Sequence, residues 1–411
     1  MKIGLLHPDS PTSEGSGAVH SATLIGETLK SRGHELVFMC PGEVDNDYDS
    51  VPTIELDIKE NSVKNKYKEI NEELIKIKDK VISYDIFHSY LMRTIPSVGE
   101  ISEYGNNIST VVSLNAFGAV CPKNDLLYKN NKDCDSNGPI RCTKCIYSSK
   151  RDMPPKPDHG QIYYEGRVIH HTIKDLKNYP IVSDINENIN KIDMYQALSS
   201  HVKNKYVRFN FPDDHIQVIP NILDDRFLEP HQSSFSEPIK LLYVGGLKKH
   251  KGADRLPEII DGLKNVDERE YMLSIIGKGP LEPQLRSEIH SRELDNVELL
   301  GFKSYSELPN IYSSSDLFLY PGRWQEPFGR VFIEALATGT PVVATDVGAA
   351  SEIIGSGGRV TQNSCRNMID EISNIDRSSF KNLSINAVEE AKKFEKEKVV
   401  SNIESMYQNL I

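Results

Sequence analysis

Two carboxylates, Glu326 and Glu334, are separated by seven residues that begin with a Pro-Phe-Gly turn. An apolar stretch, 316–320, precedes them, and apolar residues at helical spacing follow as far as Gly339. This pattern predicts a buried strand, a loop that carries Glu326, and a helix that begins near Gly329 and carries Glu334. Ligands of an open α/β sheet bind at the carboxyl ends of its strands, and helix N-termini attract anions. We therefore expect a phosphate-containing ligand beside these two glutamates.

A cluster of cations follows another predicted strand, in the string Val244-Gly-Gly-Leu-Lys-Lys-His-Lys-Gly252. Lys251 stands directly before a glycine, where the backbone can approach a ligand closely. Preorganised cations of this kind stabilise negative charge that develops on a leaving group. The chain has no Asp-x-Asp motif at a strand end, so we expect no catalytic divalent metal.

Four cysteines, Cys121, Cys134, Cys142 and Cys145, lie within 25 positions in the pattern Cys-x12-Cys-x7-Cys-x2-Cys. Four thiolates match the ligand count of a structural zinc site. An iron–sulfur cluster and reduced, unligated thiols are the alternatives. The proline-containing segment 118–160 around them is predicted to be irregular, so a metal would serve as a clip.

Bulk composition describes a globular protein of more than one domain. The chain has 411 residues, too many for one ordinary domain. Its net charge of −11 argues against a general nucleic-acid binder. No apolar run approaches a membrane span, and the first residues read as a buried strand instead of a signal peptide. We expect a cytoplasmic protein.

The order of predicted elements indicates two Rossmann-like halves. Strand 2–6, a glycine loop with Gly15 and Gly17, helix 19–31 and strand 36–39 open the first half. The glycine spacing differs from that of nicotinamide-dinucleotide sites. Further predicted elements are an exposed amphipathic helix at 59–80, strands at 85–90 and 110–115, an apolar helix after 193, a linker at 230–238, a second unit that opens at Lys240 with strands 272–276 and 297–300, and a final helix at 392–409.

The string from Tyr320-Pro321 through Glu334-Ala335 to Gly339-Thr-Pro-Val-Val resembles the donor-site signature of the retaining glycosyltransferases of family four. The four-cysteine segment resembles a subset of that family. The resemblance implies an α/β fold of GT-B type, with two Rossmann-like domains that face a central cleft. It places an acceptor-side domain at 1–230, a donor-binding domain at 231–390, and a helix at 391–411 that crosses back to the first domain.

The resemblance also implies an activity: transfer of a sugar, with retention, from a nucleotide-sugar to a hydroxyl of a glycan, lipid-linked or other acceptor, as in polysaccharide biosynthesis. A lipid-linked acceptor would bring peripheral contact with a membrane. Two other functions on similar folds stay open, namely a non-catalytic glycan-binding or scaffold protein and a nucleotide-sugar epimerase or phosphorylase.

In the family, Lys251 would bind the diphosphate, Glu334 the ribose and Glu326 the sugar. Many relatives carry a phosphate-clamping arginine where this chain has Gly246. Loops that start at Gly277 and Phe302 would line the base pocket. The predicted donor-binding residues are Gly17, Gly246, Lys251, Gly277, Phe302, Glu326, Phe328, Gly329, Arg330 and Glu334.

One departure from the family concerns catalysis. Most relatives carry a histidine after the strand that ends here in Ser113-Leu-Asn115. Asparagine can bind a sugar hydroxyl but cannot act as a general base. His88, after the preceding strand, is a candidate substitute, with a structural role as the alternative. The predicted catalytic residues are Glu326, Lys251, Asn115 and His88.

Overall fold

The computed structural model of the chain describes residues 1–13, 17–45, 48–58, 65–105, 107–130, 132–151, 160–228, 235–266 and 268–411. The chain divides into two compact units. The first comprises Met1–Pro220 together with Val400–Ile411, and the second comprises Asn221–Val399. Most of the predicted linker 230–238, and Gly15 of the glycine loop, lie outside the described residues. No described helix is long and apolar enough to cross a membrane.

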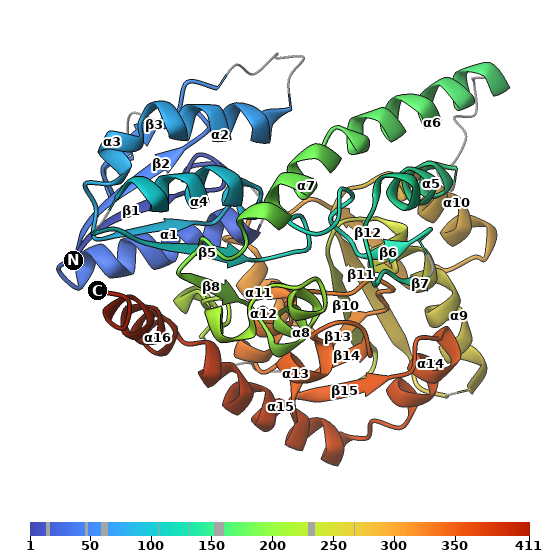
Figure 1. The fold of residues 1–411 in the computed structure, drawn as a ribbon. Helices are drawn as coiled ribbons and strands as arrows, with labels where there is room; N and C mark the ends of the chain where they lie inside the picture. Colours follow the sequence, from blue (N-terminus) through green and yellow to red (C-terminus); the bar gives the residue numbers. More distant parts are fainter. Residues whose placement is uncertain are drawn as a thin grey trace. The chain divides into compact units, whose positions relative to one another are not determined.

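The first unit contains a seven-stranded, all-parallel sheet (Figure 1). Its strand order is β3-β2-β1-β4-β5-β8-β9, so the chain reverses direction across the sheet between β1 and β4. The predicted strands at 2–6, 36–39, 85–90 and 110–115 are confirmed. The seven strands are β1 Lys2–Leu6, β2 Glu35–Cys40, β3 Thr53–Glu55, β4 Ile86–Ser89, β5 Ser109–Leu114, β8 Met194–Ala197 and β9 Ile216–Val218.

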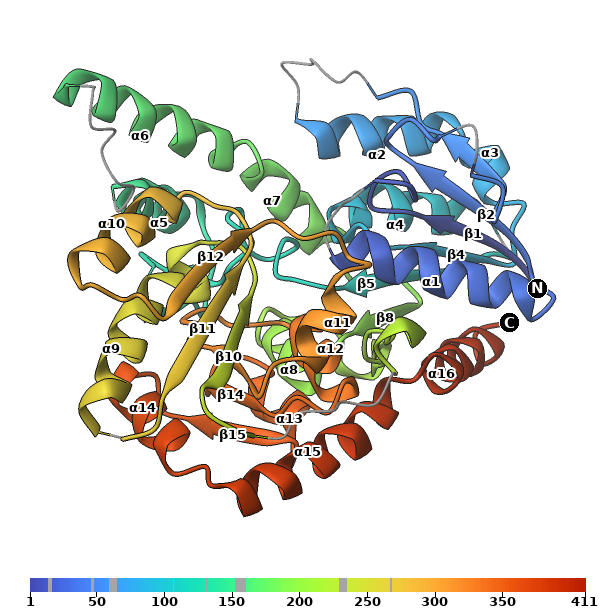
Figure 2. The same ribbon diagram turned by 180° about the vertical axis from the view of Figure 1, so that it is seen from behind.

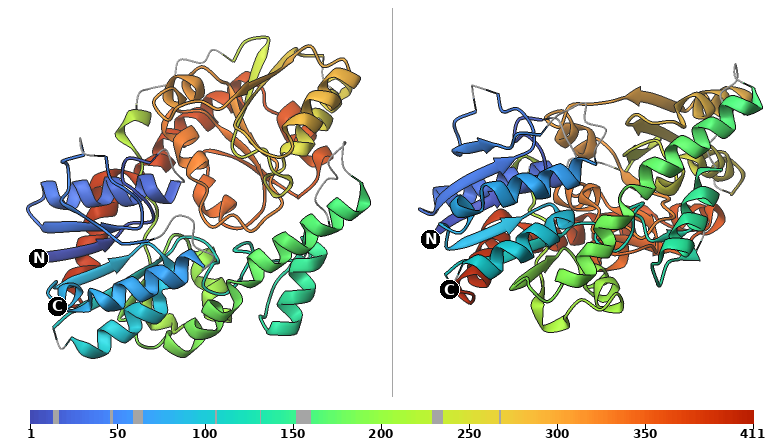
Figure 3. Two further views of the ribbon diagram at one scale, coloured as in Figure 1. Left: turned by 90° about the horizontal axis from the view of Figure 1, so that it is seen from above. Right: turned by 45° about the horizontal axis from the view of Figure 1, so that its top comes forward.

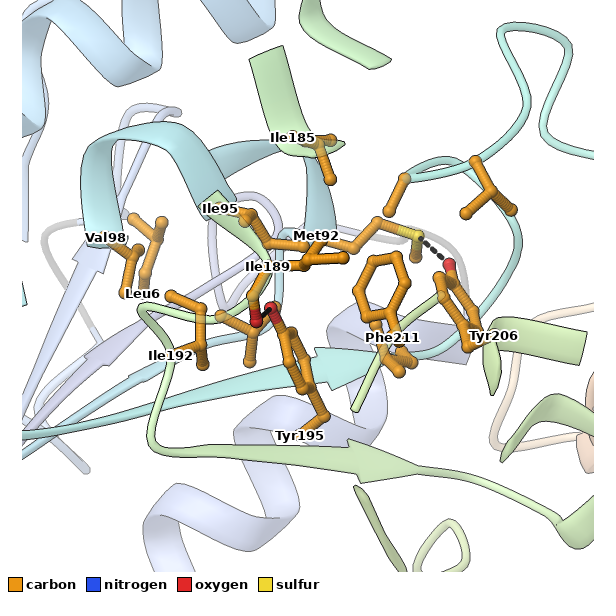
Figure 4. Packing of buried hydrophobic residues seen from close by; sticks show 14 of the residues in the cluster. Leu6, Met92, Ile95, Val98, Ile185, Ile189, Ile192, Tyr195, Tyr206 and Phe211 are labelled. Carbon is orange, nitrogen blue, oxygen red and sulfur yellow. Dashed lines mark hydrogen bonds between the residues drawn. The ribbon is translucent and has the colours of Figure 1, made fainter. Parts of the chain in front are cut away.

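Helices cover both faces of this sheet, as a parallel sheet requires. On one face lie α1 (Gly17–Ser31) and α16 (Lys396–Gln408); on the other lie α2 (Lys66–Lys76), α4 (Ile95–Tyr104) and α7 (Tyr179–Asn188) (Figure 3). Figure 4 shows the core beneath the second group, in which isoleucines of α4 and α7 pack around aromatic rings. There the Tyr206 hydroxyl donates to the sulfur of Met92 at 3.3 Å. The remaining short helices are α3 Lys78–Val81 and α8 Ser200–Arg208.

Local sequence explains where α2 starts. The side chain of Asn65 caps it by accepting from the Tyr67 N–H at 2.9 Å. Ile70 and Leu74, four residues apart, are its buried positions. The helix predicted at 59–80 is therefore present as α2 and α3, while its predicted first turn falls outside the described residues.

The structure differs from the sequence predictions at two places in the first unit. Residues 193–220 do hold a helix, α8, but they begin with strand β8, which was not predicted and which pairs with β5. Four residues are too few for a period to show, so pairing with the sheet decides their conformation. Segment 118–160 is not irregular throughout: it contains the hairpin of β6 (Leu127–Tyr128) and β7 (Lys132–Asp133) and helix α5 (Pro139–Lys150). Pro139 is the first residue of α5, a position where proline favours a helix.

The second unit contains a six-stranded, all-parallel sheet, seen best in Figure 2. Its order is β12-β11-β10-β13-β14-β15, the same order as in a dinucleotide-binding fold. The predicted strands at 272–276, 297–300 and 316–320 are confirmed. The strands are β10 Ile239–Val244, β11 Tyr271–Ile276, β12 Val297–Gly301, β13 Leu317–Tyr320, β14 Val342–Thr345 and β15 Gly358–Thr361.

Helices of the second unit also occupy both faces. α9 (Leu256–Val266) lies beside α14 (Cys365–Ser373), and α12 (Arg330–Ala337) lies beside α15 (Arg377–Ala391). The others are α10 Glu282–Ser291, α11 Leu308–Ser313 and α13 Ala350–Ile354. The consequence for function is topological: β10 and β13 are neighbours whose connections run in opposite directions, so their carboxyl-end loops form a natural ligand site.

Candidate functional site

The loops that follow β10 and β13 are fastened to each other. Gly252 has φ +79°, and a Cβ there would lie 1.9 Å from the Pro321 carbonyl oxygen. Only glycine fits this position. Arg323 grips Asp254 with two hydrogen bonds of 2.6 and 3.0 Å, and its N–H donates to the His250 carbonyl at 2.8 Å. These contacts bring Lys251 and Glu326 to the same point.

Glu326 is buried, and one of its carboxylate oxygens receives three donors. Oε2 accepts from the Lys251 ammonium at 2.6 Å, from the Tyr320 hydroxyl at 2.5 Å and from the Trp324 indole N–H at 2.8 Å. Among the described residues, none donates to the other oxygen, Oε1. The carboxylate is therefore held firmly by one oxygen while the second keeps its capacity to accept from a hydroxyl.

The charge on Glu326 follows from these neighbours. Burial alone would raise the pKa of this carboxyl, but the Lys251 ammonium and the hydrogen bonds from Lys251, Tyr320 and Trp324 outweigh it and lower the pKa. The same proximity acts in reverse on the phenol. Burial and the Glu326 charge raise the pKa of Tyr320 well above its ordinary value. Glu326 is thus an anion and Tyr320 a neutral donor.

Lys251 is half-buried beside an aromatic ring. Its ammonium lies 4.5 Å from the centre of the Trp324 ring, a cation–π contact, and pairs with Glu326. An ammonium has three donors, and the hydrogen bond to Glu326 uses one of them. Trp324 is the only tryptophan of the chain, so its fluorescence reports on this position.

The backbone around Glu326 is also fixed by close packing. The Ala349 N–H donates to the Glu326 carbonyl at 2.8 Å. Gly348 has φ +64°, and a Cβ there would lie 2.2 Å from that carbonyl oxygen. The turn before α13 therefore fixes the backbone of the Glu326 loop.

Glu334, on α12, belongs to a second, neighbouring cluster. Its two oxygens accept from the hydroxyls of Tyr305 at 3.0 Å and Tyr312 at 3.3 Å. Arg330, one turn earlier on α12, lies 3.6 Å from the carboxylate and donates to the Tyr305 hydroxyl at 2.7 Å. The side chain of Glu334 is only 4% exposed. This carboxylate is held in a fixed orientation beneath the tyrosine of the β12–α11 connection.

Other predicted donor-site residues lie at the same edge of the sheet. Gly329 caps α12 with φ +80°, next to the buried Phe328. Gly277, at the end of β11, packs against the Gly245 carbonyl. Phe302, just beyond β12, is 51% exposed, with the Lys278 ammonium 5.4 Å from its ring centre. An exposed aromatic ring at a strand's carboxyl end is a platform on which a planar group can stack.

Gly246 differs from these glycines because nothing requires it. A Cβ at this position would meet only the flexible side chain of Lys248, at 3.8 Å, and its backbone is outside the left-handed region. The position that carries arginine in many relatives is therefore sterically open in this chain.

The first unit holds Gly17, Asn115 and His88. Gly17 is the first residue of α1. Asn115 follows β5, and its amide donates to the Tyr90 carbonyl at 3.0 Å. Both thus lie at the carboxyl edge of their sheet, as predicted.

His88 has a structural role. It is fully buried, and its two ring nitrogens lie 2.6 Å from the Tyr407 hydroxyl of α16 and 2.8 Å from the Ser113 hydroxyl. Burial lowers the pKa of His88 to about 3. A neutral imidazole with both nitrogens engaged and no exposed surface cannot reach a substrate, so we do not retain His88 as a catalytic candidate.

The four cysteines line one pocket of the first unit. Cys142 and Cys145 lie on α5, and the Lys129 N–H donates to the Cys145 sulfur at 3.2 Å. Burial raises the pKa of the Cys121 thiol to about 12. Within the described part of the chain, no group of three or more His, Cys, Asp or Glu side chains is placed to hold a metal ion. The structure therefore does not support the expected zinc site.

Side chains instead anchor the cysteine segment. Arg93 donates to the carbonyls of Gly118, Cys121 and Pro122 at 3.0 to 3.3 Å. The ammonium of Lys123 reaches the Leu127 carbonyl at 2.8 Å. These hydrogen bonds hold the cysteine segment in place, which is the role that was expected of a metal ion.

Sequence reasoning missed the aromatic side chains that donate hydrogen bonds to the two glutamates. Trp324 and Tyr320 hold Glu326, and Tyr305 and Tyr312 hold Glu334. Trp324 stands two residues before Glu326, which was a usable signal. Tyr305, before α11, and Tyr312, on α11, stand more than twenty residues before Glu334 in the sequence, and only the fold brings them to it.

Known proteins with similar sequences and folds include glycosyltransferases. Residues 225–393 match the family model of the glycosyl transferases group 1. An uncharacterized glycosyltransferase of Methanocaldococcus jannaschii is 33% identical over 175 residues, which is 41% of this chain and 48% of that protein. The mannosylfructose-phosphate synthase of Agrobacterium fabrum is 34% identical over 163 residues, or 35% of each chain. The chain thus spans about half or less of the length of these curated relatives.

Solved structures resemble the whole chain. The sucrose-phosphate synthase of Thermosynechococcus elongatus has a TM-score of 0.71 at 18% identity and covers 100% of this chain and 99% of its own. The HepE protein of Anabaena in complex with UDP has a TM-score of 0.68 at 16% identity, with 100% of both chains covered. The fold is that of the GT-B glycosyltransferases, with two Rossmann-like units.

Proposed function

Because residues 225–393 match the family model of the glycosyl transferases group 1, we propose that this chain transfers a sugar from a nucleoside-diphosphate sugar to an acceptor hydroxyl, with retention of configuration. The observation that carries the proposal is the Lys251–Glu326 pair at the loops after β10 and β13. It offers one cation for a diphosphate and one carboxylate oxygen for a sugar hydroxyl at adjacent positions.

Each part of such a donor has a matching group in the second unit. Lys251 and the first N–H groups of α12 face the diphosphate, where they stabilise the negative charge that grows as the bond to the anomeric carbon breaks. Oε1 of Glu326 accepts from a sugar hydroxyl. Glu334 accepts from the ribose hydroxyls, and Phe302 stacks on the base.

Ribose binding at Glu334 requires a rearrangement of Tyr305. This hydroxyl now donates to Glu334 and accepts from Arg330, as a ribose hydroxyl would. We propose that the donor displaces Tyr305, after which ribose and Arg330 satisfy the carboxylate. The first unit supplies the acceptor side, where Asn115 binds a sugar or acceptor hydroxyl without acting as a base.

The test compounds are nucleotide-sugars that differ in base and in sugar. HepE was crystallised with UDP and with UDP-glucose, so uridine compounds head the panel, followed by GDP- and ADP-sugars. Purified protein is incubated with each donor, and release of nucleoside diphosphate is followed with and without simple glycan acceptors. We expect release from at least one donor, retained in EDTA because Lys251 provides the positive charge.

The matched variants are Lys251→Ala in the site and Lys264→Ala, an exposed lysine of α9. Loss of one charged hydrogen bond to the leaving group predicts a fall in turnover of roughly a hundredfold for Lys251→Ala and no change for Lys264→Ala. Binding of a donor without any turnover would instead favour a non-catalytic sugar-binding protein.

A further inference from the structure

Helix α6 (Gln161–Leu176) exposes a stripe of large apolar side chains. Ile162, Ile169 and Ile173 are 91%, 51% and 53% exposed. With the exposed Gly166 they stand at spacings of four, three and four residues, which places them on one face of a helix. Exposed isoleucines at this repeat are unusual on a protein surface and indicate an interaction site.

A different side of α6, about a third of a turn away from the stripe, is occupied by the protein itself. Val168 and Thr172 are its buried residues. Its two acidic side chains pair with basic residues of the α5 segment: Glu165 with Arg151 at 2.8 Å, and Asp175 with Lys150 at 2.6 Å. The acids therefore face α5, and the isoleucines face solvent. Both views of Figure 3 show α6 extending away from the sheet of its own unit.

Basic groups border the apolar stripe. The exposed positions of α6 and its cap include His170, Lys174 and Lys177 but no acidic residue. The local potential is positive: burial and the nearby cations Lys150, His170, Arg167 and Lys174 lower the pKa of His171. Segments 139–151 and 160–178 together carry seven Lys and Arg against two acids, in a chain of net charge −11.

We propose that α6 lies in the plane of an anionic membrane surface, with its isoleucine stripe at the level of the acyl chains and its basic border among the lipid phosphates. An apolar stripe bordered by cations is the pattern of interfacial helices. Anionic lipids attract such borders. A second copy of this chain would present the same positive face, so charge favours a lipid surface as the occupant. The proposal does not depend on the sugar-transfer function.

The test uses the full chain and vesicle flotation. Wild-type protein is mixed with vesicles of phosphatidylcholine alone or of phosphatidylcholine with phosphatidylglycerol. We expect flotation with the anionic vesicles, weaker at high salt, and little with the neutral ones. The combined variant Ile162→Gln, Ile169→Gln and Ile173→Gln should lower the bound fraction at least roughly tenfold.

Matched controls separate this surface from general stickiness. Ile385→Gln with Val266→Gln removes equally exposed apolar groups, 56% and 57%, from the second unit and should leave binding unchanged. Lys174→Gln with Lys177→Gln should reduce the preference for anionic lipid, and it tests the surface if the triple variant fails to fold by circular dichroism. The proposal is overturned if wild type floats with neither vesicle, if these α6 variants float like wild type, or if the stripe instead holds a dimer in sedimentation analysis.

Discussion

A single carboxylate, Glu334, shows how the site is preorganised at the scale of residues. It is nearly inaccessible and is oriented by two phenols and a guanidinium. Burying a carboxylate costs desolvation free energy, which hydrogen bonds and a charged partner must offset. We predict that Glu334→Ala weakens nucleoside-diphosphate binding by about 1.5–3 kcal/mol, or roughly ten- to a hundredfold.

Calorimetric titration and Trp324 fluorescence measure this effect independently. Glu389→Ala, an exposed glutamate of α15, is the control, and a matching circular dichroism spectrum shows that the fold survives. An unchanged affinity in Glu334→Ala would remove the ribose role from this residue.

The open position at Gly246 allows a gain of affinity to be designed. Arginine forms bidentate hydrogen bonds with phosphate, and neither backbone conformation nor neighbours exclude a side chain at Gly246. We predict that Gly246→Arg binds nucleoside diphosphate roughly tenfold more tightly. Gly166→Arg, which adds the same charge at an open position of α6, should have no effect on nucleotide affinity. Weaker binding by a folded Gly246→Arg would mean that the diphosphate does not lie near this turn.

At the scale of elements, the sequence predicted the second unit better than the first unit for a physical reason. The strands of the second unit are short apolar runs bounded by glycines and prolines, a pattern that can be read directly from the sequence. In the first unit, β8 is too short to show a period, and Pro139, one of the prolines taken as a sign of irregular structure, in fact starts α5. Glu326, Glu334 and Lys251 could be found because they adjoin strand ends, whereas Tyr305 and Tyr312 reach Glu334 only through the packing of α11 against α12.

The docking of α16 depends on a buried histidine, which makes it sensitive to acid. The pKa of His88 is about 3 in the folded chain and near 6.5 when unfolded. Above pH 6.5 the imidazole is neutral in both states. As the pH falls below 6.5, only the unfolded chain takes up the proton, so stability is lost by about 1.4 kcal/mol per pH unit until the pH approaches 3.

We therefore predict that the urea midpoint of wild type falls between pH 7 and pH 5, corresponding to about 2 kcal/mol from this group. His88→Gln should lower stability at pH 7 and show a smaller fall with pH. His290→Gln, an exposed histidine of α10, should behave as wild type. Identical pH slopes in His88→Gln and wild type would show that His88 does not govern acid sensitivity.

At the scale of the whole molecule, both units have the same sheet topology, with one strand more in the first unit, but differ in the loops and helices added to it. Both sheets are parallel. In each, the direction in which successive strands are added reverses between the first and the fourth strand along the chain, β1 and β4 in the first unit and β10 and β13 in the second. In the second unit, the loops at that reversal carry Lys251 and Glu326. In the first unit, the cysteine segment and the α5–α6 pair are additions to the same plan, and they carry the surface that we assign to lipid.

The central claim is that the second unit binds a nucleoside diphosphate through Lys251. The most direct measurement is calorimetric titration of the full chain with UDP, GDP and ADP, repeated with Lys251→Ala and Lys264→Ala. The account predicts one site per chain for at least one of these nucleotides, unchanged in Lys264→Ala and weakened roughly ten- to a hundredfold in Lys251→Ala. No saturable binding of any nucleoside diphosphate to wild type, or equal binding by wild type and a folded Lys251→Ala, would contradict it.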